Sequence, residues 1–567
     1  MGEIVRELLK LQEEDGWLAP DRLAALSEEL RVPLHRLESV STFYPHFLRE
    51  KTEATIIRVC RDLSCQLAGG ESSTRALRAW ADGRDDVVIE ETSCLGRCDR
   101  APAAGFGHRT VDAGELTTLA ECIETKQHDP LGREVRSWPA ADPYCNADSS
   151  EPGANRVEAA ANSSEPRDAD RDYRVLRQTL SGSRTAPIEE LESAGLRGMG
   201  GAGFPTARKW SLVAAEQAPS KVVICNADES EPGTFKDREL IHDLPHLLIE
   251  GMAMAAYCVG AERGTIFIRH EYEPERRRLE TELERARSLG ALGENIFGSD
   301  FSFEVDIFVS PGGYILGEET ALLECIEDRR GEPRNKPPFP GNAGLFQKPT
   351  LINNVETLVH AVGIVAKGAD WWHGLGEANF SGHKFMSTSG DVEQPGVKLV
   401  AVGTTLGALL ELHGGMSEGR ALLAIAPGGA SSNFLGPRAL DLPIDFDGLA
   451  EAGTMLGSGA AIFVAEGRDL LDVGLNITRF FRNESCGKCV PCRVGSEKAV
   501  SLIEKSGRIS DEDESLLRSL HDTMQQTSIC GLGQVALGPL LSILTEFPDQ
   551  VRSAAERDAT DPGQGGS

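Results

Sequence analysis

The sequence predicts a multidomain chain that combines α/β and α+β units and ends in a helical bundle. Its 567 residues suffice for roughly three to five domains. Strand-like and helix-like segments alternate between residues 173 and 375, as they do in an open, mostly parallel α/β sheet. Short strands with one helix follow in residues 376–465, and residues 466–548 carry apolar side chains at helical spacing. These patterns predict successive domains of different classes.

The composition excludes some classes of function. A formal net charge of −30 argues against a nucleic-acid-binding protein, because contact with phosphates needs a basic face. The apolar runs fall short of the roughly 20 residues that cross a bilayer, and the first residues lack the pattern of a signal peptide. We therefore expect a cytoplasmic protein without a membrane span, free or peripheral to a membrane complex. In such a chain the 13 cysteines are better explained as metal ligands or buried thiols than as disulfides.

Residues 1–125 begin with short amphipathic helices and continue as strands with two cysteine pairs. The pairs are Cys60 with Cys65 and Cys94 with Cys98, and each follows a predicted strand. Four thiolates from two loops are typical of a [2Fe–2S] cluster, and a glycine lets the second loop bend tightly. Zinc is the alternative, although zinc sites favour two residues between paired cysteines.

Residues 126–172 are rich in Asp, Asn, Ser, Pro and Ala and contain hardly any large apolar residue. Such a segment cannot bury enough surface to fold, so we expect a disordered linker. The charged, glycine-rich residues 549–567 are expected to form a disordered tail. The linker would leave the N-terminal domain tethered, so a chain that begins near Asp170 is expected to retain turnover with artificial acceptors.

In the stretch from Gly195 to Trp210, the first nine residues contain five glycines, Gly195 included. At this density the backbone can reach positive φ and approach a flat ring or a phosphate closely. Gly198, Gly200 and Gly203 match the dinucleotide-binding fingerprint, but that fingerprint needs a preceding strand, and the preceding residues are predicted to be helical. We expect a cofactor cradle of another kind. A flexible linker is the alternative, and the bulky side chains between the glycines argue against it.

Acidic and amide side chains cluster where predicted strands or glycine turns end, which is where open α/β sheets bind ligands. They are Asn226, Asp228, Glu229 and Glu231 after one strand, and Glu318 and Glu319 after Gly317. So many acids in one turn need groups that offset their repulsion, and the hydroxyls and donors of a ligand can do so. A solvated acidic loop is the alternative.

The C-terminal cysteines have a second, distinct spacing. Two residues separate Cys486 from Cys489 and Cys489 from Cys492, and Cys530 follows at a distance. A tight turn can offer three corners of a [4Fe–4S] cube while the last ligand comes from elsewhere in the chain. Zinc is the alternative that this spacing disfavours.

Several of these stretches resemble the flavin-bearing, NADH-oxidising subunit of respiratory complex I and the diaphorase subunits of NAD-linked formate dehydrogenases and hydrogenases. The resemblance rests on the glycine stretch and on Val222–Arg238, Gly313–Leu322 and Asn353–Thr357, and it covers roughly residues 173–548. Residues 15–125 resemble the thioredoxin-like ferredoxin subunit of complex I. In that family this subunit is usually a separate chain with a longer helical start.

The resemblance implies four domains: an N-terminal thioredoxin-like ferredoxin domain (1–125), a Rossmann-like FMN domain (173–375), a β-grasp domain (376–465) and a C-terminal helical bundle with a [4Fe–4S] cluster (466–548). It also implies which residues bind FMN and NAD(H). They are Gly198, Gly200, Gly201, Gly203, Phe204, Lys209, Asn226, Asp228, Glu229, Glu231, Tyr314, Gly317, Glu318, Glu319, Lys336, Phe339, Asn353 and Asn354. Glu231 and Lys209 are the candidates for a catalytic role, Lys209 as a group that holds or tunes the flavin.

Phe204 and Phe339 resemble the pair of rings that stacks on the adenine of NADH, and the stiff segment Lys336–Pro340 places Phe339; aromatic residues that face solvent by chance are the alternative. A carboxylate near the adenosine ribose binds its 2′-hydroxyl and repels a 2′-phosphate, so NADH is expected to be preferred over NADPH. Leu212 stands where the family commonly has a third phenylalanine, which should weaken the stacking.

Hydride transfer moves two electrons at once, whereas iron–sulfur clusters accept one each, and FMN converts between the two. We therefore expect an NADH dehydrogenase (diaphorase) module that passes electrons to or from partner redox subunits of the complex I, formate dehydrogenase or hydrogenase type. The fused N-terminal domain, and Leu316 where complex I usually has Cys, favour the NAD⁺-reducing diaphorase of a soluble formate dehydrogenase or hydrogenase as the alternative. A zinc-bearing scaffold without turnover is the alternative from another class.

Overall fold

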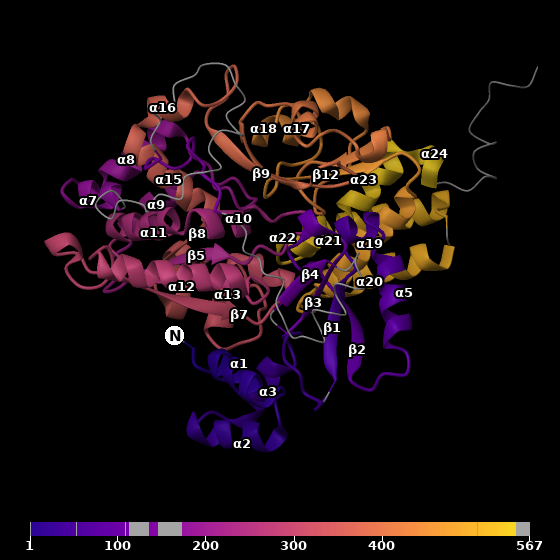
Figure 1. Ribbon diagram of the computed structural model, residues 1–567, viewed down its shortest axis with the longest axis horizontal. Helices are drawn as coiled ribbons and strands as arrows, with labels where there is room; N and C mark the ends of the chain where they lie inside the picture. Colours follow the sequence, from indigo (N-terminus) through magenta and orange to yellow (C-terminus); the bar gives the residue numbers. More distant parts are fainter. Residues whose placement is uncertain are drawn as a thin grey trace, which may run out of the picture.

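The computed structural model describes residues 2–52, 54–107, 109–112, 135–145, 173–506 and 508–551. These residues form three four-stranded sheets and a group of C-terminal helices (Figure 1). We refer to the sheets as the first, central and third sheets in chain order. Within the described residues, no helix combines the length and the apolar character that a membrane crossing requires.

The N-terminal part begins with three helices, α1 (Ile4–Asp15), α2 (Pro20–Glu29) and α3 (Leu34–Ser41). The first sheet follows, and two more helices, α4 (Leu63–Leu67) and α5 (Gly70–Ala81), lie between its first two strands. Its strands are β1 (Thr55–Cys60), β2 (Val87–Thr92), β3 (Ala103–Phe106) and β4 (Arg109–Asp112), in the order β2-β1-β3-β4. Strands β1 and β2 are parallel, and α5 lies in the crossover that such a pair needs. The two predicted strands that precede the cysteine pairs are confirmed as β1 and β2.

The central sheet is parallel throughout, in the order β7-β6-β5-β8. Its strands are β5 (Val222–Ala227), β6 (Arg263–Arg269), β7 (Glu304–Ser310) and β8 (Thr350–Asn354). Its helices are α7 (Arg174–Leu180), α8 (Ala186–Ala194), α9 (Thr206–Ala215), α10 (Lys236–Asp243), α11 (Pro245–Val259), α12 (Glu273–Ser288), α13 (Glu319–Ile326), α14 (Pro340–Ala343), α15 (Val355–Lys367) and α16 (Ala369–His373). Because helices cover a parallel sheet on both faces, β5 and α11 are apolar and buried almost throughout. The predicted open α/β sheet is confirmed.

The third sheet is mixed, in the order β10-β9-β12-β11. Its strands are β9 (His383–Gly390), β10 (Gly396–Ala401), β11 (Leu422–Ala426) and β12 (Ala460–Ala465), and its helices are α17 (Leu406–Leu412) and α18 (Phe446–Glu451). The inner strands β9 and β12 are parallel, and each outer strand is antiparallel to its neighbour.

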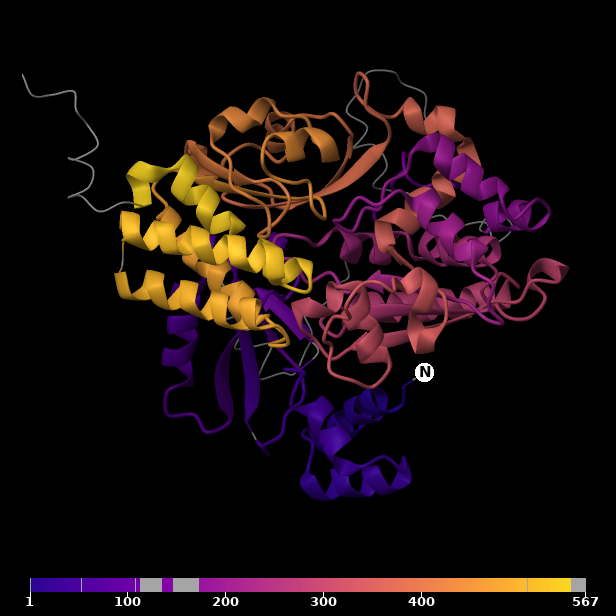
Figure 2. The same ribbon diagram turned by 180° about the vertical axis from the view of Figure 1, so that it is seen from behind.

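The C-terminal helices carry the second cysteine set. They are α19 (Leu470–Asn483), α20 (Val490–Ser506), α21 (Asp511–Thr527), α22 (Gly531–Val535), α23 (Gly538–Glu546) and α24 (Pro548–Val551). The predicted apolar face of α19, with Leu470, Val473 and Ile477, is buried. Figure 2 shows these helices in yellow beside both the third sheet and the first sheet.

The first sheet and its loops are built into the rest of the molecule. Arg238 of α10 donates to the Gly96 carbonyl at 2.6 Å, and Arg269 of β6 donates to the Cys94 carbonyl at 2.6 Å. On the other side, Asn476 of α19 donates to the Arg61 carbonyl at 2.7 Å. The prediction of a merely tethered N-terminal domain is therefore wrong. The composition of a connecting segment carries no information about contacts that the connected domains make directly.

Part of the predicted linker also packs on helices α10 and α11. Of residues 126–172, the structure describes 135–145; the others lie outside the described residues, as does the tail beyond residue 551. Trp138 donates to Asp243 at 2.9 Å, and Tyr144 donates to the buried Glu250 at 2.8 Å. For this piece the expectation of disorder fails, because two aromatic residues anchor a stretch that is otherwise poor in apolar side chains.

Candidate cofactor and iron–sulfur sites

The glycine stretch forms a closed loop between α8 and α9. Gly198 N–H donates to the Phe204 carbonyl at 2.9 Å, and the Arg197 side chain donates to the Gly203 carbonyl at 2.9 Å. Gly201 and Gly203 adopt φ angles of 129° and 62°, which side chains with a Cβ rarely tolerate. A helix rather than a strand leads into the loop, so it is not the standard dinucleotide fingerprint.

The first turn of α15 supports this loop. Met199 N–H donates to the Thr357 hydroxyl at 2.9 Å. A Cβ at Gly200 would lie 2.9 Å from the Cβ of Asn354, so glycine is needed for the loop to approach so closely. The structure thus brings the predicted residues Gly200 and Asn354 together although they are distant in the sequence.

Helix α9 contains the predicted Lys209 and contacts the other predicted asparagine, Asn353 of β8. Trp210 Nε1 donates to Asn353 Oδ1 at 2.9 Å, and Lys209 Nζ donates to the Ile352 carbonyl at 3.1 Å. Burial lowers the pKa of Lys209, while the charge of the nearby Glu319 opposes that shift. Lys209 is therefore a partly buried lysine on α9 whose ammonium end is held by a backbone carbonyl of β8 and interacts with the charge of Glu319.

The polar residues of the acidic loop after β5 make different contacts. Glu229 caps α10, because it accepts from the N–H groups of Asp237 at 2.8 Å and Arg238 at 3.0 Å. Burial raises the pKa of Glu229 to about 7. Asn226 Nδ2 donates to the Gly317 carbonyl at 2.9 Å, which joins the two predicted ligand turns. Glu229 therefore stabilises the fold in this structure, and Asn226 links the loops around the cradle.

Asp228 is the buried acid of this loop that lacks a firm partner. Among the described residues, neither of its oxygens meets a donor in good hydrogen-bonding geometry. Burial raises its pKa to about 8, with Arg269 opposing the shift and Glu271 adding to it. At neutral pH Asp228 is therefore mostly protonated and can donate a hydrogen bond to a polar ligand.

Glu231 connects the acidic loop to the third sheet. Its carboxylate accepts from the Tyr314 hydroxyl at 2.6 Å and from Ser431 N–H at 2.7 Å. Burial raises the pKa of Glu231, and these two hydrogen bonds oppose the shift. Tyr314 N–H in turn donates to Glu484 at 2.7 Å, just before the C-terminal cysteines.

The paired carboxylates after Gly317 are not free of counter-charge. Lys336 Nζ lies 3.0 Å from Glu318 and 2.7 Å from Glu319. Glu318 also caps α13 by accepting from the N–H groups of Thr320 and Ala321. The sequence predicts carboxylates that repel a 2′-phosphate. In the structure they share the ammonium group of Lys336, which reduces that repulsion.

Two aromatic rings stand exposed near this charge group. Phe204 is 39% exposed and Phe339 is 54% exposed. Leu212, at the position of the missing third ring, is 55% exposed. Exposed rings on well-defined backbone offer flat apolar faces to a nucleobase.

The N-terminal cysteines converge from the two loops, as their spacing predicts. Cys60, Cys65, Cys94 and Cys98 are all buried, and the sulfur atoms of Cys94 and Cys98 are 3.5 Å apart. Backbone N–H groups point at these sulfurs, from Gly96 to Cys94 at 3.4 Å and from Gly233 to Cys98 at 3.3 Å. A two-iron cluster spreads four thiolates over two metal atoms and takes such N–H···S contacts, so the donor set fits it.

The C-terminal cysteines come together from the turn before α20 and the start of α22. Cys492 lies close enough to Cys489 and Cys486, and Cys530 to Cys486, for their charges to interact. Burial raises the pKa of Cys492 to about 11 and that of Cys530 to about 12, so metal binding there must displace protons. Three ligands from one turn and one from a separate helix fit a four-iron cube.

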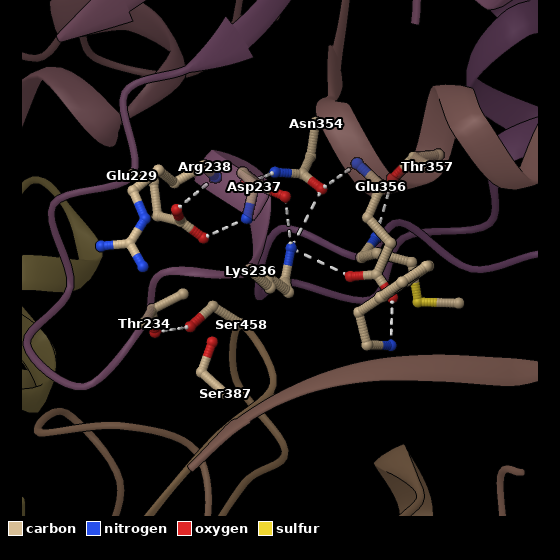
Figure 3. A network of polar contacts seen from close by, with 12 residues as sticks. Glu229, Thr234, Lys236, Asp237, Arg238, Asn354, Glu356, Thr357, Ser387 and Ser458 are labelled. Carbon is tan, nitrogen blue, oxygen red and sulfur yellow. Dashed lines mark hydrogen bonds and ion pairs between the residues drawn. The ribbon is translucent and has the colours of Figure 1, made fainter. Parts of the chain in front are cut away.

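Two buried lysines form a part of the site that sequence reasoning misses. Lys236 and Lys384 are fully buried, and both contact Glu356 in the first turn of α15. Figure 3 shows the contact of Lys236 with Glu356. Lys236 lies within the stretch Val222–Arg238 that carries the resemblance, but its burial has no signature in composition or spacing. Lys384 lies in β9, a strand that is buried on both faces from Lys384 to Ser389, whereas a lysine is almost never fully buried unless it is paired.

Three protein families match successive parts of the chain. Residues 1–127 match the thioredoxin-like [2Fe-2S] ferredoxin family, residues 191–362 the Nuo51 FMN-binding domain, and residues 472–554 the iron-sulfur binding region of NADH-ubiquinone oxidoreductase F. Each match covers the cysteine set or the cradle that the structure shows in that part.

Known proteins resemble longer parts of the chain. An F subunit of the NADH-quinone oxidoreductase of Rhizobium meliloti is 42% identical over 66% of this chain and 90% of its own length. The HndC subunit of the NADP-reducing hydrogenase of Solidesulfovibrio fructosivorans is 38% identical over 67% of this chain and 78% of its own length. A chain in the crystal structure of the air-oxidized NAD⁺-reducing [NiFe]-hydrogenase aligns with 96% of this chain and 92% of its own, with a TM-score of 0.80 and 30% identity.

Proposed function

The chain belongs to the family of the F subunits of NADH-quinone oxidoreductases, and on this premise we propose that it is an NADH dehydrogenase (diaphorase) module with FMN and two iron–sulfur clusters. The observation that carries the proposal is that one chain combines the glycine cradle with two sets of four cysteines, one before the cradle and one after it in the sequence. The chain's partners are other redox subunits, to or from which the clusters pass electrons.

The cradle residues bind and orient FMN, which supplies the conversion between a hydride and single electrons when bound. Gly198, Gly200, Gly201 and Gly203 let the backbone approach the cofactor, and Asn353 and Asn354 support that loop. Protonated Asp228 donates a hydrogen bond, and Lys209 supplies a fixed positive charge. Glu231 positions Tyr314 and Ser431 rather than transferring a proton to substrate, because both of its oxygens are already engaged.

The nucleotide binds over the exposed rings of Phe204 and Phe339, with its adenosine ribose toward Glu318, Glu319 and Lys336. The carboxylates accept from the ribose hydroxyls, while Lys336 limits how strongly they repel a 2′-phosphate. We therefore propose a preference for NADH that is real but moderate.

A second candidate direction is the reduction of NAD⁺ by electrons from a hydrogenase or formate dehydrogenase partner. The observation that favours it is coverage: the hydrogenase chain aligns with 96% of this chain, whereas the Rhizobium meliloti relative spans 66%. The fused N-terminal domain therefore has a counterpart in the hydrogenase. The proteins that co-purify with this chain identify the direction.

We also propose the domain boundaries 1–125, 173–375, 376–465 and 466–548. The third sheet supports a β-grasp fold for residues 376–465, because its two inner strands are parallel, its outer strands are antiparallel and α17 follows the first hairpin.

Spectroscopy and analysis of the purified protein test the function. FMN, about six iron atoms per chain and NADH-dependent reduction of ferricyanide are expected from one flavin and both clusters. A colourless protein that holds only zinc would contradict the proposal and support the scaffold alternative.

Nucleotide choice is tested by Glu319→Gln. Removing one carboxylate should raise the ratio of NADPH to NADH activity by roughly fivefold to tenfold. This is the lower end of the roughly 1–3 kcal/mol of a charge-assisted contact, because Lys336 already offsets part of the charge. Glu393→Gln, which neutralises an exposed carboxylate between β9 and β10, is a suitable control. An unchanged ratio would mean that Glu319 does not face the ribose.

A further inference from the structure

Four charged residues form a buried cluster beneath the glycine loop. Lys236, Glu356 and Lys384 are fully buried, and Asp237 is 3% exposed. Lys236 Nζ lies 2.7 Å from Asp237 and 2.9 Å from Glu356 (Figure 3). Lys384 Nζ lies 2.5 Å from Glu356. Two ammonium and two carboxylate groups balance each other. Burial of such a group is costly, and pairing offsets that cost only while the balance is kept.

The buried charge cluster fixes the orientation of Asn354. Asn354 Nδ2 donates to Asp237 at 2.5 Å, while Asn354 Oδ1 accepts from Glu356 N–H at 3.0 Å and lies 3.5 Å from Lys236 Nζ. The amide therefore has one favourable orientation. Asn354 in turn makes the close contact with Gly200 that shapes the glycine loop.

The third sheet contributes directly to this cluster. Lys384 is on β9, and its Nζ also donates to the carbonyls of Phe385 at 3.1 Å and Ser458 at 3.2 Å. Phe385 N–H donates to the second oxygen of Glu356 at 2.9 Å. A Cβ at Gly459 would lie 2.4 Å from Lys384 Nζ, so the loop before β12 leaves space for the lysine.

We propose that this buried charge cluster sets the shape and the charge of the flavin cradle from below, with Lys384 as a positioning residue supplied by the third sheet. The inference rests on the proposed binding of FMN at the glycine loop. Lys384 pairs with Glu356, and Glu356 in turn pairs with Lys236. The backbone N–H of Glu356 donates to Asn354, which packs against Gly200. The third sheet thereby takes part in the cofactor site through α15.

The balance of charge provides a test with opposite signs. Lys384→Met leaves two carboxylates with one ammonium, whereas Glu356→Gln leaves two ammonium groups with one carboxylate. Reduction adds negative charge to a bound cofactor, so surplus negative charge nearby lowers its potential and surplus positive charge raises it. The double variant restores neutrality.

The cluster should also give the wild-type protein a specific pH response. Burial, together with the charge of Lys236, lowers the pKa of Lys384 to about 8 against the opposing effects of Glu356 and Asp237. His360, which also faces Glu356, has a pKa lowered by burial and is neutral at and above pH 7. Above about pH 8 the wild-type protein should therefore approach the behaviour of Lys384→Met.

The experiment measures FMN affinity of flavin-depleted full-length protein by fluorescence and the FMN midpoint potential by redox titration. Lys384→Met should weaken FMN binding about tenfold and lower the potential, and Glu356→Gln should raise it. A tenfold change in the ratio of affinities for oxidised and reduced FMN corresponds to about 30 mV for a two-electron couple. Lys384→Arg should retain most of the wild-type behaviour, and Lys398→Met on the neighbouring strand β10 is the matched control.

The possible results separate the two levels of inference. Shifts of opposite sign in the single variants, with the double variant near wild type, support the cluster. If the FMN midpoint potentials of the two folded, FMN-loaded single variants are unchanged or shift in the same direction, the proposal is wrong. If Lys384→Met does not fold, the comparison of Glu356→Gln with the double variant still decides. A wild-type protein that binds no FMN would instead refute the proposed function.

Discussion

The two cysteine sets differ in how far the rest of the molecule encloses them. At the N-terminal set all four thiols are at most 4% exposed, and loops from the central sheet cover them. At the C-terminal set only Cys492 is buried, and the neighbouring Val490 and Val494 are 58% and 54% exposed. The first set is closed by tertiary contacts, whereas the second is built from one turn and a nearby helix and stays open on one side.

Two sites with the same cysteine ligands can therefore depend to different degrees on contacts with the rest of the protein. The closed set depends on buried arginines: Arg238 binds the Gly96 carbonyl and Asp99, and Arg269 binds the Cys94 carbonyl. Loss of these contacts should affect the cofactor cradle, because the same arginines adjoin the acidic loop. The open set has few such dependencies, so it should tolerate change and exchange electrons with an external partner.

The largest expected effect comes from removing one ligand of each set. Cys489→Ser should reduce the iron content of reconstituted protein from about six to about two atoms and leave FMN in place. Cys94→Ser should remove about two iron atoms and also loosen FMN, because its loop is packed on the central sheet.

Iron analysis and flavin release on denaturation measure both outcomes. If well-folded wild-type protein holds only about two iron atoms, the assignment of the C-terminal cube is wrong.

A chain that begins at Asp170 tests the closed interface as a whole. From the contacts in the structure we expect it to lose FMN affinity or diaphorase rate by at least tenfold, about 1.4 kcal/mol, because the partners of Arg238 and Arg269 are removed. Steady-state rates with ferricyanide at matched flavin content measure the effect. Equal rates in both proteins would show that the interface does not support the cradle.

Replacing one arginine at each site compares how much the contacts there contribute to the free energy of unfolding. Arg238→Met leaves the Asp99 carboxylate and the Gly96 carbonyl without their buried partner, which should cost about 3 kcal/mol of unfolding free energy. Arg493→Met removes an exposed contact to the Gly487 carbonyl and should cost less than about 1 kcal/mol. Urea unfolding of the two variants should show this difference, and similar losses would remove the distinction between closed and open sites.

The smallest effect concerns the kinetics of iron loss in the unmodified protein. A chelator reaches exposed thiolates more readily, so the signal of the C-terminal cluster should disappear before that of the N-terminal cluster. Electron paramagnetic resonance of the reduced protein follows the two signals separately. Simultaneous loss would mean that the difference in burial does not govern access.

Much of the fold could be predicted because its signals are local. The apolar run of β5 indicates a buried parallel strand, and the spacing of Cys486, Cys489 and Cys492 indicates three ligands on one turn. The glycine stretch likewise indicates close approach through its own residues. Periodicity, turn chemistry and ligand spacing act over a few residues, so the sequence carries them directly.

The main helices and strands, the two thiol groups and the glycine cradle can therefore be inferred from the amino-acid sequence alone. Which charges meet depends on the packing of the domains: Lys336 with Glu319, Arg238 with Asp99, and Lys384 with Glu356 across 28 residues. This packing also closes the first sheet onto the central one despite the low-complexity segment between them. The physical reason is that burial and charge pairing depend on distances set by the packing of whole sheets and helices, and no local pattern encodes those distances.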